Sequence, residues 1–251
     1  ADFCFDEKYG FRDYRGGGRS SGRETIGRVA AGAIAVKMLS GLGIKFLTYT
    51  RSIGPVTINE VNFDAHEIYN NSLYMPDADA ALKASEYLEE CLKSLNSSGG
   101  VCECVITGLP VGLGDPVFEK IDANLAKAIM SIGAVKGFEI GSGFSSSTKK
   151  GSDNNDKIRV RDGKTVFETN NAGGILGGIS NSDQIVFKTY FKPTPSISFT
   201  QDTIDDQKNE IQLTIKGRHD PCIGVRAVVV VEAMASAVIL DFLLRRRCDR
   251  I

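Results

Sequence analysis

The stretch Arg15-Gly-Gly-Gly-Arg-Ser-Ser-Gly-Arg-Glu24 combines glycines, cations and a helix start, and the rest of the chain is organised around it. Three consecutive glycines allow positive φ angles and let the backbone approach a ligand closely. Ser21 and Glu24 have the spacing of a capping box, which predicts a helix that begins near Ser21. The N–H groups at that helix start favour a phosphate or carboxylate, as do the arginines around it. A solvated basic loop that only caps a core helix explains the same local pattern, and the pattern does not decide between the two.

Two alanine-rich apolar segments, residues 25–42 and 225–244, predict core helices that are approached in similar ways. Gly18-Arg19 precedes the first segment and Gly217-Arg218 precedes the second, which suggests an internal duplication. Chance similarity between two alanine-rich helices is the alternative. Strands are predicted at 44–53, 101–107 and 184–190, and further helices at 76–95 and 116–132. Together these elements predict a layered α+β fold in which two central helices lie between antiparallel sheets.

The length, composition and net charge of the chain are typical of an ordinary globular enzyme. With 251 residues, 30 basic and 31 acidic side chains and a net charge of -1, nothing favours bulk binding of nucleic acid or of an anionic membrane. The segment 225–244 is long enough to span a membrane, but Glu232 and Asp241 interrupt it, so we interpret it as a core helix. The six cysteines lack metal-site spacing, predict no metal, and are typical of reduced cytosolic thiols.

The polar segment 145–164 predicts a mobile flap or exposed loop rather than a domain boundary, so we expect one domain over residues 1–251. The chain opens in mid-pattern at Ala1-Asp2-Phe3, without a signal-peptide or transit-like pattern. We therefore expect it to be a piece of a longer protein.

Two short motifs carry candidate chemistry. Lys216-Gly-Arg-His-Asp-Pro-Cys222 places Asp220 where it could act as a general base or proton relay, and Arg218 where it could clamp an anion. The alternative is a helix start, with Asp220 as the cap and Pro221 in the first turn. Lys192-Pro-Thr-Pro-Ser196 offers a cation and two hydroxyls on a stiff backbone, or else a simple strand exit. Motifs of serine hydrolases, zinc proteases and Walker-type nucleotide sites are absent from the sequence, which favours a phosphate-handling or flavin-handling site.

Four motifs resemble those of one enzyme family. They are residues 17–35, Asn171-Ala-Gly-Gly-Ile-Leu-Gly-Gly-Ile-Ser180, Lys192 to Ile197, and Gly217-Arg-His-Asp-Pro-Cys-Ile-Gly-Val-Arg226. Their sequence and order resemble the chorismate synthase family over the whole chain. The resemblance implies a duplicated β-α-β sandwich, usually a homotetramer. It also implies the last step of the shikimate pathway, a 1,4-elimination of phosphate from 5-enolpyruvylshikimate 3-phosphate to give chorismate, with reduced flavin mononucleotide (FMN) as the cofactor.

The resemblance also implies roles for individual residues. Asp220 matches an aspartate thought to assist proton loss, and Arg19 and Arg218 match arginines that contact both the flavin and the substrate. The flavin contacts implied are Arg19, Ser20, Ser21, Gly133, Ala134, Gly177, Lys192, Pro193, Thr194, Pro195, Ser196 and Arg218.

Several features depart from the family pattern. The chain begins at Ala1-Asp2, so we expect it to lack the family's N-terminal region with its two catalytic histidines and several phosphate-binding arginines. Gly22 replaces the usual alanine, and Asn171-Ala172 lacks a histidine often found between them. We expect the observed part of a chorismate synthase, with a truncated flavin-binding paralogue or assembly subunit without catalysis as the alternative. The source of reduced flavin, a separate reductase or an NAD(P)H-dependent activity of the protein, stays open. The expected location is the cytoplasm, with a plastid not excluded.

Overall fold

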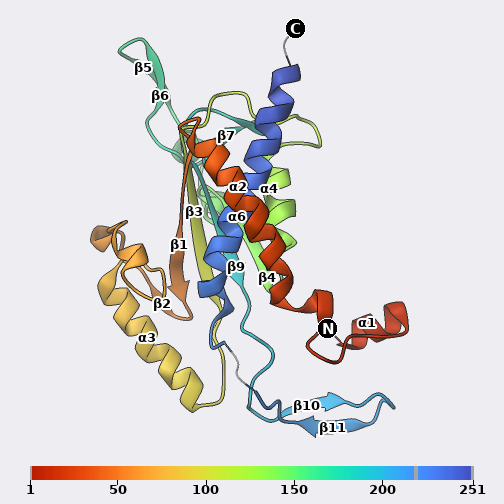
Figure 1. Cartoon of the computed structure of the whole chain (residues 1–251). Helices are drawn as coiled ribbons and strands as arrows, with labels where there is room; N and C mark the ends of the chain where they lie inside the picture. The colour runs from red at the N-terminus through yellow and green to blue at the C-terminus, as the bar shows by residue number, and fades with distance from the viewer. Residues whose placement is uncertain (1, 218–219, 250–251) are drawn as a thin grey trace.

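A five-stranded antiparallel sheet forms the centre of the computed structural model, which describes residues 2–217 and 220–249 (Figure 1). The strand order is β2-β1-β3-β9-β4. The bounds are β1 Lys45–Ile53, β2 Val56–Thr57, β3 Gly100–Thr107, β4 Val135–Ile140 and β9 Ile185–Phe191. Every neighbouring pair is antiparallel, and the strands predicted from the sequence agree with β1, β3 and β9 to within a residue.

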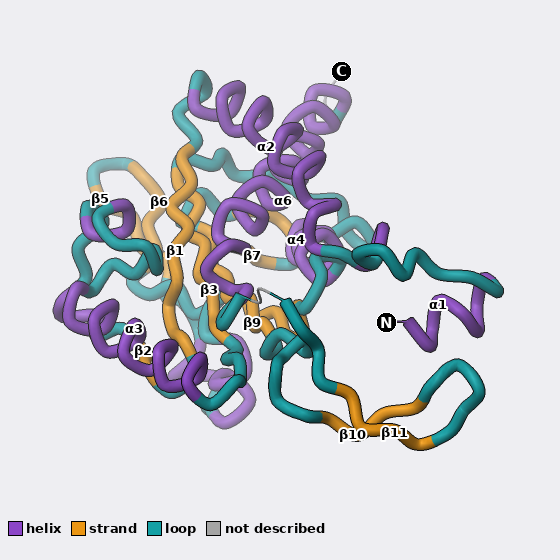
Figure 2. Tube along the Cα trace, turned by 60° about the horizontal axis from the view of Figure 1, so that its bottom comes forward, coloured by secondary structure: helices purple, strands orange, loops and turns teal. Residues whose placement is uncertain are grey.

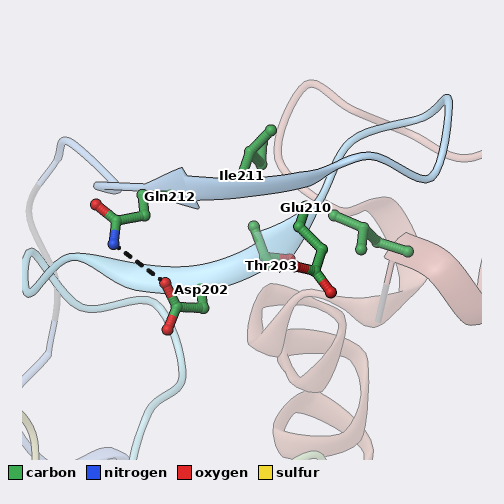
Figure 3. A pocket seen from close by; sticks show the side chains of 6 residues that line it. Asp202, Thr203, Glu210, Ile211 and Gln212 are labelled. Atoms are coloured by element: carbon green, nitrogen blue, oxygen red, sulfur yellow. Dashed lines mark hydrogen bonds between the residues drawn. The ribbon is translucent and has the colours of Figure 1, made fainter.

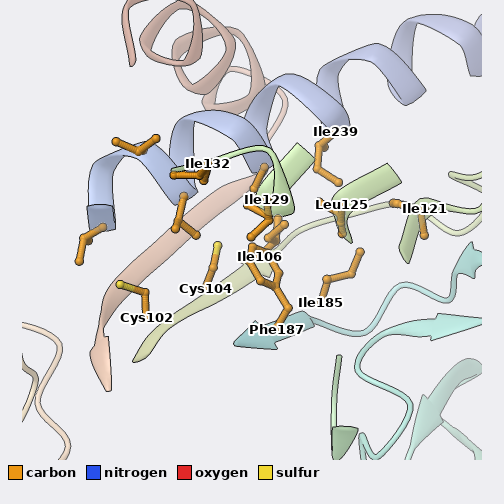
Figure 4. Close-up of a cluster of buried hydrophobic side chains, with 14 of the residues drawn as sticks. Cys102, Cys104, Ile106, Ile121, Leu125, Ile129, Ile132, Ile185, Phe187 and Ile239 are labelled. Atoms are coloured by element: carbon orange, nitrogen blue, oxygen red, sulfur yellow. The ribbon is translucent and has the colours of Figure 1, made fainter. Parts of the chain in front are cut away.

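One face of this sheet packs against two helices, α6 (Ile223–Arg245) and α4 (Ile121–Met130). Alternate residues of β3 and β9, such as Cys104 and Phe187, point into this layer and are fully buried (Figure 4). Ile129 of α4 and Ile239 of α6 meet them from the helical side. This period-two alternation matches the sequence pattern of a strand with one buried face.

The opposite face of the sheet is covered along β1 by α3 (Ala78–Lys93) and the loop before it. Tyr49 and Leu47 of β1 point to this side, where they join Ile68, Met75 and Leu88 in a second buried cluster. The sheet therefore lies between α3 on one face and the α4 and α6 layer on the other.

Helix α2 (Thr25–Ser40) packs in parallel against α6, on the side away from the sheet. Gly22 lies beside Ile223, Gly32 faces Ala233, and the Ser236 hydroxyl donates to the Gly32 carbonyl at 3.3 Å. The N-termini of the two long helices therefore lie at the same end of the molecule. The predicted pair of central helices and the α+β class are confirmed.

The sequence predictions for α2 are wrong in two details. The helix begins at Thr25 rather than near Ser21, because two short 3-10 turns, Gly18–Ser20 and Gly22–Glu24, precede it. Its apolar composition also predicts burial on all sides, whereas Ile26 and Ile34 are 78% and 65% exposed. No second large sheet covers this outer face within residues 2–217 and 220–249, so one half of the expected sandwich is seen.

The remaining elements lie around this core. Near the start of α2 lie α1 (Asp2–Tyr9) and a hairpin of β10 (Gln201–Ile204) and β11 (Glu210–Leu213), which projects from the body (Figure 2). At the opposite end lie the β7–β8 hairpin (Ile175–Leu176 and Ile179–Ser180) and the β5–β6 hairpin (Ile158–Arg161 and Lys164–Phe167). The predicted polar loop contains a 3-10 helix (Gly143–Thr148), α5 (Gly151–Asn154) and β5, so it is exposed but not structureless.

In the described part of the chain, one stretch, Ile223–Cys248, has the length and composition to cross a membrane. Half of its apolar window is buried in the protein, and α6 contacts α2, α4 and the sheet. This packing is that of a core helix. All six cysteines have free thiols.

Candidate functional site

The glycine-rich stretch forms a tight corner at the N-terminus of α2. Gly17 and Gly18 adopt φ angles of 82° and 48°, as the glycine run predicts. The Ser20 hydroxyl donates to the Gly17 carbonyl at 2.6 Å, and the Ser21 side chain accepts from the Arg23 N–H at 3.4 Å. Ser21 therefore caps a 3-10 turn rather than α2 itself. The side chain of Arg19 is exposed.

Asp220 lies at the same end, just before α6. Its carboxylate forms an ion pair with the Arg226 guanidinium, with Oδ1 and Nη2 2.9 Å apart. The alternative with Asp220 as helix cap is wrong, because the N-cap is Cys222 and the helix begins at Ile223. The proposed arginine clamp, Arg218, and the neighbouring His219 fall outside the described residues.

Hydrogen bonds connect three further segments at this end. The Lys192 N–H donates to the Ala134 carbonyl at 3.0 Å, which joins two segments that the family resemblance assigns to the flavin. The Ser97 hydroxyl donates to the Thr194 carbonyl at 2.7 Å, and the Ser98 N–H donates to the Pro221 carbonyl at 2.7 Å. The loop at 96–100 thus links the proline-rich segment, residues 192–196, to the start of α6. No local signal in the sequence marks the serines of this loop as residues that connect the two segments.

The hydroxyl of Thr194 bears on whether these residues fit a polar ligand. Its Oγ1 is buried and has no hydrogen-bond partner among the described residues. A buried hydroxyl without a partner is costly, so such atoms mark places where a ligand or water completes the bonding. Gly133 precedes Ala134, whose carbonyl accepts from Lys192. A Cβ added at Gly133 would meet no atom within 4 Å, so there is open space beside it. The segment therefore fits a ligand with hydrogen-bonding atoms at its edge, as a flavin has.

Cys222 lies beside this site but is not suited to act as a nucleophile. Burial raises the pKa of its thiol, against the smaller lowering effect of the N–H groups of Gly224 and Val225. The thiol therefore stays neutral at neutral pH and behaves as a small apolar side chain.

Gly177 is not brought together with the other predicted residues. It lies in the turn between β7 and β8, where the Gly178 carbonyl accepts from the Ile121 N–H at 3.0 Å at the start of α4. Nearby, Asp115 pairs with Arg245 at the C-terminal end of α6. The 23 residues of α6 correspond to about 34 Å at about 1.5 Å per residue. Gly177 and the N-terminal end of α6 are thus separated by the length of this helix.

Two concavities of the described chain lie elsewhere. One of about 610 Å³ lies against the β10–β11 hairpin, where Gln212 donates to Asp202 at 3.3 Å (Figure 3). Another of about 300 Å³ lies between the C-terminal ends of α2 and α6, with Met38, Leu42 and Leu240 among its lining residues. Neither is lined by the predicted site residues. No group of three or more potential metal ligands occurs within residues 2–217 and 220–249.

Comparisons with known proteins agree on one family. A family model described as chorismate synthase matches residues 1–244. The chain is 75% identical over 254 residues to the chorismate synthase of Agathobacter rectalis, covering 100% of this chain and 69% of that protein. It is 58% identical to the chorismate synthase of Lachnoclostridium phytofermentans, covering 97% of this chain and 67% of that protein. A crystal structure of a chorismate synthase matches with a TM-score of 0.80 and 31% identity, over 96% of this chain and 69% of that one. This chain therefore belongs to the chorismate synthase family.

Proposed function

We propose that the end of the molecule where α2 and α6 begin is the reduced-FMN and substrate site of a chorismate synthase. Members of this family are phosphate lyases of the shikimate pathway. The observation that supports the proposal is the parallel packing of α2 on α6, in which Gly22 of the glycine-rich corner lies beside Ile223, the first residue of α6 after the segment at 220–222. Hydrogen bonds add the segments at 133–134 and 192–196 to the same end.

In this site Arg19, Ser20 and Ser21 would contact the flavin, as would Gly133, Ala134 and the run from Lys192 to Ser196. Bound reduced FMN supplies electron density that favours the loss of phosphate from 5-enolpyruvylshikimate 3-phosphate. Arg19 and Arg218 would hold the leaving phosphate through charge-assisted hydrogen bonds. Asp220 would accept the substrate proton at a carboxylate oxygen, with Arg226 bound to its other side. Gly177 lies about the length of α6 away from these residues, so it is not part of this proposed site.

The partners proposed are small molecules and copies of the same chain. The substrate is 5-enolpyruvylshikimate 3-phosphate, and the assembly is a homotetramer. Reduced flavin would come from a flavin reductase or from an NAD(P)H-dependent activity of the protein itself. The bacterial relatives and the free thiols support a cytoplasmic location.

Anaerobic turnover of 5-enolpyruvylshikimate 3-phosphate with photoreduced FMN, followed by phosphate release, tests the function, with flavin binding read by fluorescence in the same sample. We expect Asp220→Asn to bind FMN as the wild type does and to lose most of the turnover. Removing the Thr194 hydroxyl in Thr194→Val should raise the FMN dissociation constant about threefold to tenfold, the effect of one hydrogen bond.

Thr165→Val, on the exposed β5–β6 hairpin, is the matched control and should leave FMN binding unchanged. Flavin binding without turnover in the wild type would fit a chorismate synthase core without the family's N-terminal acid/base residues, and it would equally fit the truncated, non-catalytic alternative. A wild-type chain that binds no FMN would contradict the proposed site.

A further inference from the structure

Arg28, in the first turn of α2, donates two hydrogen bonds to Ser131 at the end of α4. Its Nη1 donates to the Ser131 hydroxyl at 2.6 Å and its Nη2 to the Ser131 carbonyl at 3.2 Å. Ser131 in turn donates its hydroxyl proton to the Ala128 carbonyl at 2.6 Å, so its lone pairs are free to accept. The guanidinium therefore caps the C-terminal end of α4, where the last carbonyls of a helix lack intrahelical partners and positive charge is favourable.

The other side of the same guanidinium is fixed by the glycine-rich corner. Nε of Arg28 donates to the Glu24 carboxylate at 3.0 Å, and Nη1 also lies 3.8 Å from the Met234 sulfur on α6. The side chain is 24% exposed. All three nitrogens of the group are thus engaged, and the side chain spans α2, α4 and α6.

The contact with Ser131 bears on the site because Ser131 lies close in the chain to two of the predicted flavin contacts. Gly133 and Ala134 come two and three residues later, and Ala134 adopts a φ of 70°, a strained angle for a residue with a side chain. Its carbonyl accepts from Lys192, the first residue of the proline-rich segment. One guanidinium therefore joins two segments that are 103 residues apart and, through Ala134, a third.

We propose that Arg28 is a positioning residue of the flavin site: it holds the loop at 131–134 in register with the corner at 17–24. This role rests on the proposed function of the site. Arg28 is not assigned a contact with flavin or substrate, and it acts through Ser131 and Glu24. Lysine cannot replace it fully, because an ammonium has no planar fork to bind the Ser131 hydroxyl and carbonyl together.

The test is a double-mutant cycle on FMN affinity, measured by fluorescence in the whole chain. Arg28→Met should raise the FMN dissociation constant about tenfold or more, since charge-assisted hydrogen bonds are lost. Arg28→Lys should restore part of this loss. Ser131→Ala removes one of the two contacts and should have a smaller effect, and the double variant should be no weaker than Arg28→Met alone. Lys37→Met, an exposed basic residue on the same helix, is the control and should bind as the wild type does.

Amide hydrogen exchange separates this inference from the function on which it rests. Arg28→Met should speed exchange of the Lys192 amide, which is bonded to Ala134, without flavin present and by more than it speeds exchange of the other β9 and β4 amides. If the wild type binds FMN but Arg28→Met binds equally well, or if the two single variants add independently, Arg28 does not position the loop. If exchange at Lys192 rises as expected but the wild type binds no FMN, the link between the segments stands, whereas the proposed site and the role of Arg28 in it are both overturned.

Discussion

At the scale of single residues, Asp77 shows how one side chain holds two parts of the fold together. Its carboxylate accepts from the Ala80 N–H at 3.1 Å, which caps α3, and from the Asn59 N–H at 2.9 Å in the preceding loop. Asp77 is 2% exposed. Burial acts to raise the pKa of this carboxyl, but the N–H donors outweigh burial and the net pKa is lowered.

We expect Asp77→Ala to lower the free energy of unfolding by about 2–3 kcal/mol, because it removes a helix cap and leaves a buried N–H without an acceptor. Since the pKa of Asp77 is lowered in the folded state, its contribution is complete above the ordinary carboxyl pKa of about 4 and is lost as the pH falls further. Urea unfolding at pH 7 and pH 3 measures this difference. Asp79→Ala, exposed in the same turn, is the control. A difference between wild type and Asp77→Ala that is as large at pH 3 as at pH 7 would contradict the assignment to the charged carboxylate.

At the scale of elements, the packing of α2 on α6 depends on a residue without a side chain. A Cβ added at Gly32 would overlap with the Cβ and Cα of Ala233, whereas one added at Gly27 on the same helix would meet nothing within 4 Å. The two helices therefore approach each other closely at Gly32, and a side chain at this position would push them apart.

Gly32→Ala should destabilise the chain by about 1–3 kcal/mol, since α2 must move away from α6 to make room. Gly27→Ala should be neutral or stabilising by up to about 1 kcal/mol, because alanine favours the helix and no contact is disturbed. The melting temperatures of both variants check this pair. Because the site is built from both helix starts, Gly32→Ala should also weaken FMN binding. Equal melting temperatures for the two variants would show that the close approach at Gly32 does not occur.

The elements also show what the sequence could predict. Strands and core helices were predictable because period-two and apolar patterns are local, and β1, β3, β9 and α6 were placed correctly for that reason. The start of α2 was not, because Ser21 and Glu24 satisfy the capping pattern while the chain forms two 3-10 turns instead. The site segments were recognisable as motifs, but the sequence did not predict which of them lie close together in the fold. Contacts such as Arg28 with Ser131 join residues 103 positions apart and leave no local signal.

At the scale of the whole molecule, the α2–α6 pair is covered by a sheet on one side only in the described residues. This arrangement explains why α2 departs from the prediction of a fully buried helix. Its composition is that of a helix buried on both sides, but Gly32, Ala35 and Leu39 are its only buried residues among those described. The apolar residues of α2 are therefore more numerous than its contacts in the described chain can bury.

The stability of the whole chain should also depend on Glu232, in the middle of α6. Burial raises the pKa of this carboxyl, against a smaller lowering effect of the Thr48 side chain on β1. The folded state thus keeps the proton to a higher pH than the unfolded state does. Stability from this group is therefore complete below the ordinary glutamate pKa of about 4.3 and declines as the pH rises through the raised value.

Glu232→Gln removes this decline, because the amide keeps the size and polarity of the protonated carboxyl without a charge to bury. We expect its melting temperature to equal that of the wild type near pH 4 and to exceed it increasingly towards pH 8. Asp241→Asn, on an exposed turn of the same helix where it pairs with Arg245 at 3.7 Å, should show no such gain and serves as the control. A gain of Glu232→Gln that is constant across the pH range would mean that the two side chains differ in packing rather than in the cost of a buried charge. A gain that grows with pH would show that the charged form of Glu232 destabilises the packed position of α6.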